Sequence, residues 1–263
     1  MDGPFSTPPE LVVFDVNGTL SDPAPLGEAF AELGAPPAAA DLWLTETLRD
    51  GFALTVTGSF VSFSALQEAT LRRLLSGVEV LRRPVSEASA EVMRVFATLD
   101  VHPDVADGMR RLAEAGVRMA TLSNGRSAHA AALLRRAGLE DLVEGNFSVK
   151  QVGRWKPAPE PYLYAAASCG VPPWRAVLVA VHPWDVDGAK RAGLLGALLD
   201  RGEAPYPDPL LPPDLRASSL PALAERLIEA GAGRTRSLPQ RAGSRGQQAD
   251  IGAGEGFRRS PAG

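Results

Sequence analysis

The sequence predicts an α/β protein in which a doubly wound parallel sheet carries a helical cap inserted after its first strand. Two observations predict this class. Along most of the chain, short apolar runs alternate with stretches of helical periodicity. Between residues 23 and 100, in contrast, the apolar spacing is helical throughout. A chain of 263 residues with 45% hydrophobic content can bury one substantial core and a smaller second one.

Strands are expected where an apolar run is short and is followed by polar or turn residues. These runs are Leu11–Phe14, Val117–Leu122, Phe147–Val149, Ala176–Val181 and Leu194–Leu199. Helical patterns lie between or after them, at Asp104–Ala115, Ser127–Ala137, Glu160–Cys169 and Leu220–Ala230. Because alternating strands and helices are joined by right-handed crossovers, we expect a parallel, Rossmann-like sheet with both faces covered.

The insertion has its own pattern. Helices are predicted over Leu26–Leu33, Ala40–Ala53, Phe60–Leu75 and Ser86–Leu99. We therefore predict a core domain at 1–22 and 101–230, a helical cap domain at 23–100, and hinges at Ser21–Pro25 and Val101–Asp104. Residues 204–213 are rich in proline and are expected to form irregular coil, and residues 231–263 are expected to form a disordered tail.

Composition restricts the partners and the compartment. The net charge is −4 with both signs interspersed, which predicts no nucleic-acid surface. Cys169 is the single cysteine, so the chain forms no internal disulfide, as is typical of a reducing cytoplasm. No apolar run is long enough to span a bilayer, and the first ten residues lack the pattern of a signal peptide. We expect a cytoplasmic protein with no membrane partner.

Polar side chains follow the predicted strands in an order that makes a site. Asp15 and Thr19 follow the first strand, Ser123 and Asn124 the second, Lys156 precedes a helix among prolines, and Asp185 follows the Ala176–Val181 strand. The carboxyl ends of parallel strands meet at one edge of a sheet, where open α/β proteins bind their ligands. One lysine between two aspartates keeps Asp15 ionised, which suits a nucleophilic carboxylate.

These motifs resemble those of the haloacid dehalogenase superfamily. The resemblance lies in Asp15 within Asp-Val-Asn-Gly-Thr-Leu, Ser123 after the second strand, Lys156-Pro157 and the acidic motif at Asp185. It implies a capped α/β hydrolase whose aspartate attacks an electrophile, forming an ester or acyl phosphate that water then hydrolyses. A small-molecule substrate is implied, and a homodimer is compatible because similar proteins are commonly dimeric.

The phosphatases of the superfamily carry a second aspartate two residues after the nucleophile, as general acid and base. Here that position is Asn17, which cannot donate and recover a proton in this way. Val181 stands where those enzymes have an acid that helps to hold Mg²⁺. We therefore expect no metal and no cofactor.

The chain is more similar to the type II 2-haloacid dehalogenases, which need no metal and whose halide leaves unprotonated. The resemblance includes Tyr162, six residues after the lysine, and Trp184 before Asp185. It implies that Asp15 displaces halide from the α-carbon and that Asp185 and Lys156 position the hydrolytic water. Ser123, with nearby backbone N–H groups, is then expected to bind the substrate carboxylate, and Thr19, Asn124 and Tyr162 to contact the substrate.

Three departures from that subgroup are visible. Asn17 replaces a tyrosine or a similar residue, while Ala180 and His182 replace a serine and an asparagine. The arginine that cradles halide directly after a tryptophan is replaced by Leu44. We predict that Asn17 contacts substrate, that His182 positions water or substrate, and that Arg49 is the nearest substitute cation.

Two other functions remain open on the sequence. One is a Mg²⁺-dependent phosphatase acting on a small phosphomonoester, and the other is a weakly catalytic binding protein. Chelation by EDTA separates the phosphatase from the dehalogenase, and Asp15→Asn separates catalysis from binding.

Overall fold

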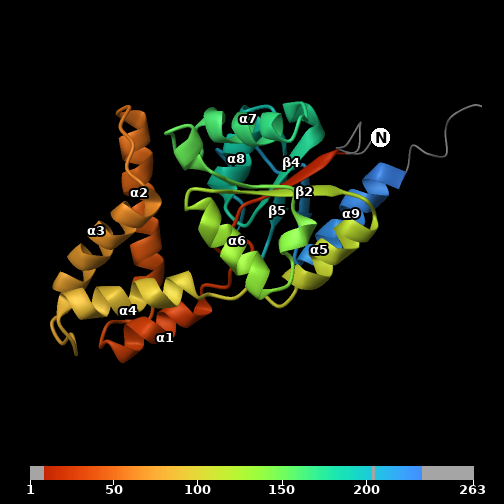
Figure 1. The fold of residues 1–263 in the computed structure, drawn as a ribbon. Coiled ribbons are helices and arrows are strands. Elements are labelled where there is room, and N and C mark those ends of the chain that lie inside the picture. The colour runs from red at the N-terminus through yellow and green to blue at the C-terminus, as the bar shows by residue number, and fades with distance from the viewer. Residues whose placement is uncertain (1–8, 203–204, 233–263) are drawn as a thin grey trace, which may run out of the picture.

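The computed structural model describes residues 9–202 and 205–232. Its centre is a parallel sheet of six strands in the order β3-β2-β1-β4-β5-β6 (Figure 1). The strands are β1 Leu11–Phe14, β2 Arg118–Ser123, β3 Asn146–Ser148, β4 Ala176–Ala180, β5 Leu195–Leu199 and β6 Leu215–Ala217. The strand order reverses at β1, which pairs with β2 on one side and β4 on the other. The doubly wound α/β prediction is confirmed, and the residue after β1 lies at the switch point where such sheets bind ligands.

Helices cover both faces of the sheet. They are α5 Val105–Glu114, α6 Ser127–Arg136, α7 Pro159–Ser168, α8 Pro183–Arg191 and α9 Leu220–Ala232. Side chains of β1 alternate between the two faces, as the pleat requires. Val12 and Phe14 join the hydrophobic core formed with α5, α6 and α9, and Leu11 and Val13 join the core formed with α7 and α8.

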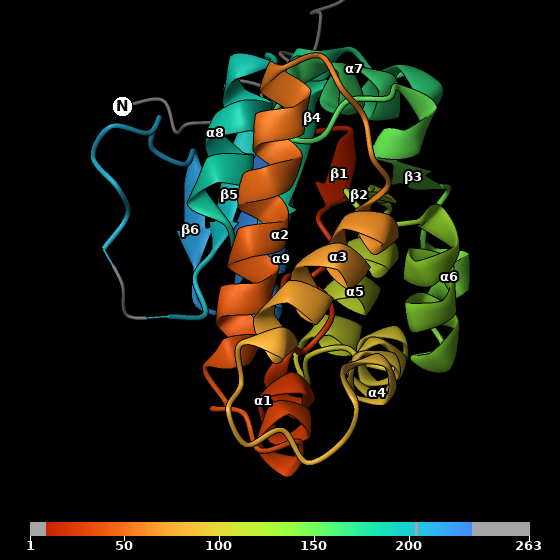
Figure 2. The ribbon, with the colours of Figure 1, turned by 90° about the vertical axis from the view of Figure 1, so that its left-hand side faces the viewer.

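The helical insertion lies between β1 and β2, beside the sheet (Figures 1 and 2). It contains α1 Ala24–Glu32, α2 Ala39–Val56, α3 Phe63–Ser76 and α4 Val85–Ala97. These helices share a hydrophobic core in which the buried Trp43 contacts Phe30 and Phe96. Trp155, from the loop before α7, joins the same core and packs against Gly51 of α2. The domain boundaries at residues 22 and 100 stay a prediction.

The two segments that join insertion and sheet are bonded to each other. The backbone N–H of Asp22 donates to the carbonyl of Asp100 at 2.8 Å, and that of His102 donates to Leu20 at 2.9 Å. Ser21 also forms an antiparallel bridge with Val101. Both predicted hinges therefore meet in one two-stranded neck.

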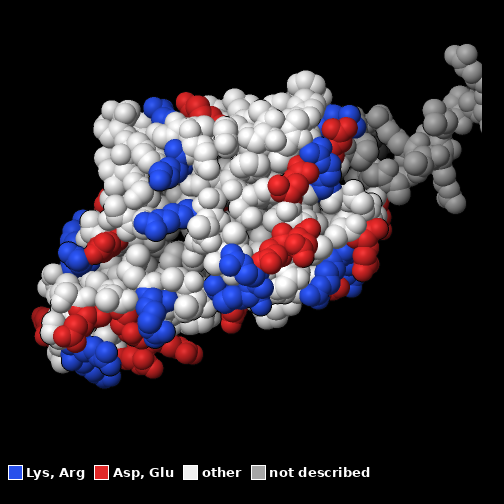
Figure 3. All heavy atoms as spheres, in the orientation of Figure 1, with Lys and Arg blue, Asp and Glu red and all other residues white. Residues whose placement is uncertain are grey.

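Local differences from the sequence prediction are few. Strand β6 was not expected, and short 3-10 helices form at Glu140–Leu142, Val149–Gln151 and Pro173–Arg175. The predicted disordered tail lies outside the described residues, except for residues 231 and 232, which end α9. Within the described part of the chain, no helix combines the length and the apolarity that crossing a membrane requires. On the face drawn in Figure 3, acidic and basic side chains are interspersed.

Candidate active site

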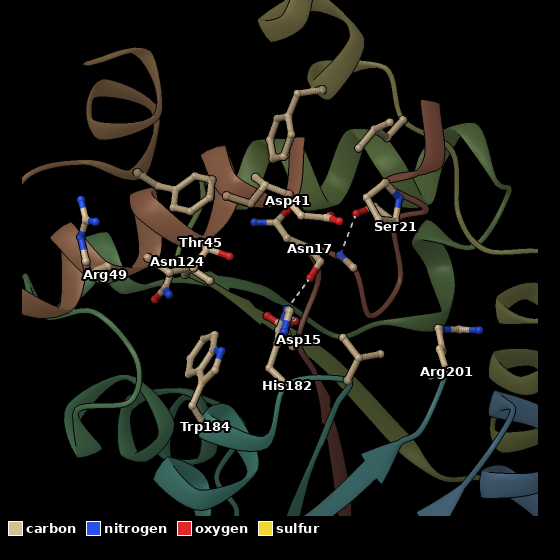
Figure 4. Close-up of a pocket in the computed structure, with 18 of the residues that line it drawn as sticks. Asp15, Asn17, Ser21, Asp41, Thr45, Arg49, Asn124, His182, Trp184 and Arg201 are labelled. Carbon is tan, nitrogen blue, oxygen red and sulfur yellow. Dashed lines mark hydrogen bonds and ion pairs between the residues drawn. The ribbon is translucent and has the colours of Figure 1, made fainter. Parts of the chain in front are cut away.

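Asp15 lies at the end of β1 and reaches the cavity between sheet and insertion (Figure 4). The residue as a whole is 4% exposed. Oδ1 accepts a hydrogen bond from Lys156 Nζ at 2.7 Å, and Oδ2 accepts one from the Thr19 hydroxyl at 2.7 Å. Burial by itself raises the pKa of Asp15, but the charges of Lys156 and His182 and these hydrogen bonds outweigh it, so the pKa is lowered. The carboxylate is thus held ionised and oriented.

Lys156 is fully buried and its ammonium group connects two carboxylates. Besides Asp15, Nζ donates to Asp185 Oδ2 at 2.6 Å and to the carbonyl of Leu122 at 3.1 Å. The backbone N–H of Lys156 donates to Asn124 Oδ1 at 3.0 Å, which ties the lysine to the loop after β2. Burial lowers the pKa of the lysine, but the two carboxylates raise it overall. All three ammonium protons are directed at protein acceptors.

Asp185 lies in the first turn of α8, behind Lys156. Its Oδ1 accepts a 2.5 Å hydrogen bond from the Tyr162 hydroxyl, and burial raises its pKa. Neither Asp185 nor Lys156 lines the cavity. Lys156 holds Asp15 and Asp185 holds Lys156, while their role in positioning water stays a prediction.

Three predicted substrate contacts also lie behind the cavity wall. Tyr162 is buried and bonds to Asp185. The Thr19 hydroxyl donates to Asp15 and accepts a hydrogen bond from the backbone N–H of Val181 at 3.1 Å. Ser123 accepts the backbone N–H of Gly125 at 2.9 Å and shapes the turn that precedes α6. None of the three is among the residues that line the cavity, and their contact with substrate stays a prediction.

Asn17, Asn124 and His182 do line the cavity with Asp15. The Oδ1 atom of Asn17 is buried and has no hydrogen-bond partner among the described residues. His182 Nε2 lies 3.0 Å from the carbonyl of Asn17 and 3.8 Å from Asp15 Oδ2. Gly18, with φ of +78°, makes the tight turn under the imidazole.

Trp184, which precedes Asp185 in the motif of the resemblance, also lines the cavity. Its ring stacks on His182 at a centroid distance of 5.3 Å and meets Phe52 of α2 edge-on at 5.0 Å. The core and the insertion are therefore in aromatic contact beside Asp15.

Arg49 borders the cavity, but its side chain is 56% exposed and donates to Asp50 at 2.8 Å. In Figure 4 its guanidinium group does not point toward Asp15. Leu44, where the resemblance places an arginine, does line the cavity. The halide-binding cation of the resembling subgroup therefore has no direct counterpart at these two positions.

Two basic side chains that line the cavity, those of His102 and Arg201, were not predicted from the sequence. His102, in the neck, approaches the carbonyl of Gly18 at 3.0 Å. Arg201, two residues after β5, pairs with Asp104 at 2.8 Å and donates to the carbonyl of Thr19 at 3.3 Å. Arg201 could have been found, because it follows the carboxyl end of a strand in the same sheet.

The donor set beside Asp15 does not suit a hard divalent cation. Mg²⁺ prefers several oxygen ligands, but the nearest second carboxylate, Asp185, is committed to Lys156 and Tyr162. Among the residues that the structure describes, no three acidic, histidine or cysteine side chains gather in a way that could hold a metal ion.

Residues 9–193 match the family model of the haloacid dehalogenase-like hydrolases. The chain belongs to this family. The family predicted from the motifs is thereby confirmed, as is its closer similarity to the L-2-haloacid dehalogenases.

Individual relatives give the range of similarity within this hydrolase family. The chain is 26% identical over 223 residues to (S)-2-haloacid dehalogenase 1 of Pseudomonas sp. (strain CBS-3), covering 84% of this chain and 97% of the relative. It is 29% identical over 198 residues to a phosphoglycolate phosphatase of Nitrosospira multiformis, covering 72% and 82%. The solved L-2-haloacid dehalogenase of Xanthobacter autotrophicus, with chloropropionic acid covalently bound, superposes with a TM-score of 0.74 at 25% identity, covering 84% and 98%.

Proposed function

We propose that this haloacid dehalogenase-like hydrolase cleaves the carbon–halogen bond of 2-haloalkanoic acids through an ester on Asp15. One observation carries the proposal. The ionised carboxylate of Asp15 opens onto the cavity, while the side chain two residues on, Asn17, has no proton to give to a leaving group. This combination suits a leaving group that departs as an anion. Similarity to the curated and solved dehalogenases supports it.

In the first step, a lone pair of the Asp15 carboxylate attacks C2 of the substrate. The C2–halogen bond breaks, and the halide leaves with the bonding electrons, so the configuration at C2 inverts and no proton moves. Thr19 and Lys156 hold the carboxylate by one hydrogen bond to each oxygen. Fixing both oxygens restricts the rotation of the nucleophile, which favours a near-attack geometry.

In the second step, water attacks Cγ of the Asp15 ester. Negative charge develops on the carbonyl oxygen, where the Lys156 ammonium stabilises it. The ester C–O bond then breaks, giving the 2-hydroxy acid and the restored carboxylate, with one proton released. His182 lies at the cavity surface with Nε2 3.8 Å from Asp15 Oδ2, and we assign it the positioning of the water.

The substrate carboxylate is assigned to the loop after β2. Asn124 borders the cavity, and its Oδ1 is already fixed by the backbone N–H of Lys156. Its amide nitrogen is therefore the group available to donate to the substrate. Asn17 is the second amide side chain that lines the cavity.

Halide release from 2-chloro- and 2-bromopropionate tests the proposal. We expect turnover by the wild-type chain and none by Asp15→Asn, while Asp141→Asn, an exposed aspartate far along the chain, retains wild-type rates. A single turnover in H₂¹⁸O is expected to place the label on Asp15. Label in the hydroxy acid after that first turnover contradicts the covalent ester.

A phosphatase is the second candidate, because a curated relative of comparable identity is named as one. It forecasts phosphate release that EDTA abolishes and Mg²⁺ restores. The dehalogenase forecast is halide release that neither reagent changes. Running both substrates with and without EDTA decides between the two.

A further inference from the structure

The cavity is much larger than a short haloacid. Its volume is about 800 Å³. Allowing about 30 Å³ for each non-hydrogen atom, the share that a water molecule has in the liquid, 2-chloropropionate fills roughly 180 Å³. The remaining space is in the range typical of pockets for drug-sized ligands, roughly 300–1,000 Å³.

Helix α2 presents two parallel rows of side chains to this space. One row, Leu44, Leu48 and Phe52, is apolar, and the other, Asp41, Thr45 and Arg49, is polar. Both rows have a spacing of four residues, which keeps each on one face of a helix. Phe63, Phe96 and Leu99, from the rest of the insertion, extend the apolar wall.

We propose that the substrates carry a large apolar substituent on C2, a medium-length alkyl chain or an aromatic ring, bound along the Leu44–Leu48–Phe52 row. This inference rests on the proposed function, because Asp15 and Asn124 fix the reacting end. Leu44 contributes directly, since an apolar side chain now stands where the resembling subgroup has its arginine.

The charges of the cavity set the direction in which the substrate lies. Asp41 lines the cavity on α2 and repels a carboxylate there, whereas Asn124 is a neutral donor beside Asp15. The acid group is thus directed to the sheet and the substituent to the insertion. Arg49, paired with Asp50 and half exposed, leaves the apolar row uninterrupted.

Chain length is expected to change catalytic efficiency strongly. Each methylene that is transferred from water to the apolar wall improves kcat/KM by about fourfold, if its burial is complete. Between 2-bromopropionate and 2-bromo-octanoate we expect kcat/KM to rise at least tenfold, because part of the longer chain stays solvated. The gain is expected mainly in KM, since the alkyl chain does not change on reaching the transition state.

The test measures bromide release from 2-bromopropionate, 2-bromohexanoate and 2-bromo-octanoate by the full chain and two variants. Leu48→Trp fills the space beside the apolar row, and we expect it to abolish most of the preference for the long acids. Leu42→Trp is the matched control, because Leu42 lies on the same helix, is 52% exposed and does not line the cavity. We expect it to retain the wild-type preference.

The outcomes separate the two proposals. Bromide release that is flat or falls with chain length overturns the inference and leaves the proposed function standing. If no acid releases bromide, the proposed function fails, and calorimetric binding of octanoate and propionate then tests the apolar site alone. Octanoate binding at least tenfold tighter, and weakened by Leu48→Trp, supports it; equal binding of both acids overturns it.

Discussion

Replacing Lys156 with methionine is expected to destabilise the protein strongly, in a way that depends on pH. Methionine keeps most of the apolar volume of the lysine stem but removes the charge. In the wild type, Nζ is within 2.7 Å of oxygens from both Asp15 and Asp185, and the side chains of Lys156 and Asp185 are fully buried. The variant thus leaves two carboxyl groups facing each other with no cation between them.

The magnitude follows from the burial of these groups. Removing one partner of a buried ion pair costs about 3–5 kcal/mol, because the remaining charge is neither solvated nor paired. The two pairs of Lys156 do not add, since one carboxyl group can take up a proton and bond to the other. Against a total stability of roughly 5–15 kcal/mol, the loss leaves a folded but marginal protein.

The pH dependence has a definite sign. In the wild type the pKa of Asp15 is below its ordinary value of 3.8, so the stabilisation it provides is present above that value and is lost at lower pH. In the variant, burial raises the pKa of both carboxyl groups. The free energy of unfolding then falls as the pH rises from the ordinary to the raised pKa. The stability that the variant loses relative to the wild type is therefore largest near pH 7 and shrinks toward pH 4.

Urea unfolding followed by tryptophan fluorescence, at pH 7 and pH 4.5, measures this deficit. The control is Lys150→Met, at an exposed lysine, with an expected change under about 0.5 kcal/mol. The double variant with Asp185→Asn is expected to recover part of the loss, because one buried charge is gone. A loss of unfolding free energy below about 1 kcal/mol, or an equal loss at both pH values, refutes this account of Asp15, Lys156 and Asp185.

Three further outcomes are expected. Tyr162→Phe removes the donor to Asp185 Oδ1 and lowers the free energy of unfolding by roughly 1–3 kcal/mol in the same urea assay, whereas Tyr164→Phe changes it little. Gly51→Ala places a Cβ in steric overlap with the Trp155 ring, and this overpacking is expected to cost about 1–3 kcal/mol; unchanged stability contradicts the contact. Burial and the Glu144 carboxylate raise the pKa of Cys169 to about 12, so a thiol reagent at pH 8 is expected to label the folded chain much more slowly than the unfolded chain.

Strands β1 and β4 were predictable because each is a fully apolar run, buried on both faces. Leu11–Phe14 forms the central strand with the predicted bounds. Strand β6 was missed for the opposite reason. It is a three-residue edge strand, its middle residue Arg216 is exposed, and proline-rich coil precedes it, so no apolar run marks it.

The charged residues at the centre of the candidate site were predictable from the sequence, but which of them face the cavity was not. Sequence order placed Asp15, Lys156 and Asp185 at one edge of the sheet, and the structure brings their side chains into contact. Which of them face the cavity depends on burial, and no local pattern shows that Lys156 and Asp185 lie behind Asp15. The contact between Trp184 and Phe52 joins residues 132 positions apart, so only the packing of the insertion on the sheet reveals it.

The two-stranded neck has a consequence for how this chain can vary. Ser21 and Val101 form an antiparallel bridge. The whole insertion is therefore connected to the sheet like the loop of a hairpin. The entropy of closing such a loop grows only with the logarithm of its length. Helices can therefore be lengthened, exchanged or removed between these two positions at little thermodynamic cost to the strands. The neck separates the sheet, which must keep Asp15 in position, from the insertion, whose sequence can change to fit a different substrate.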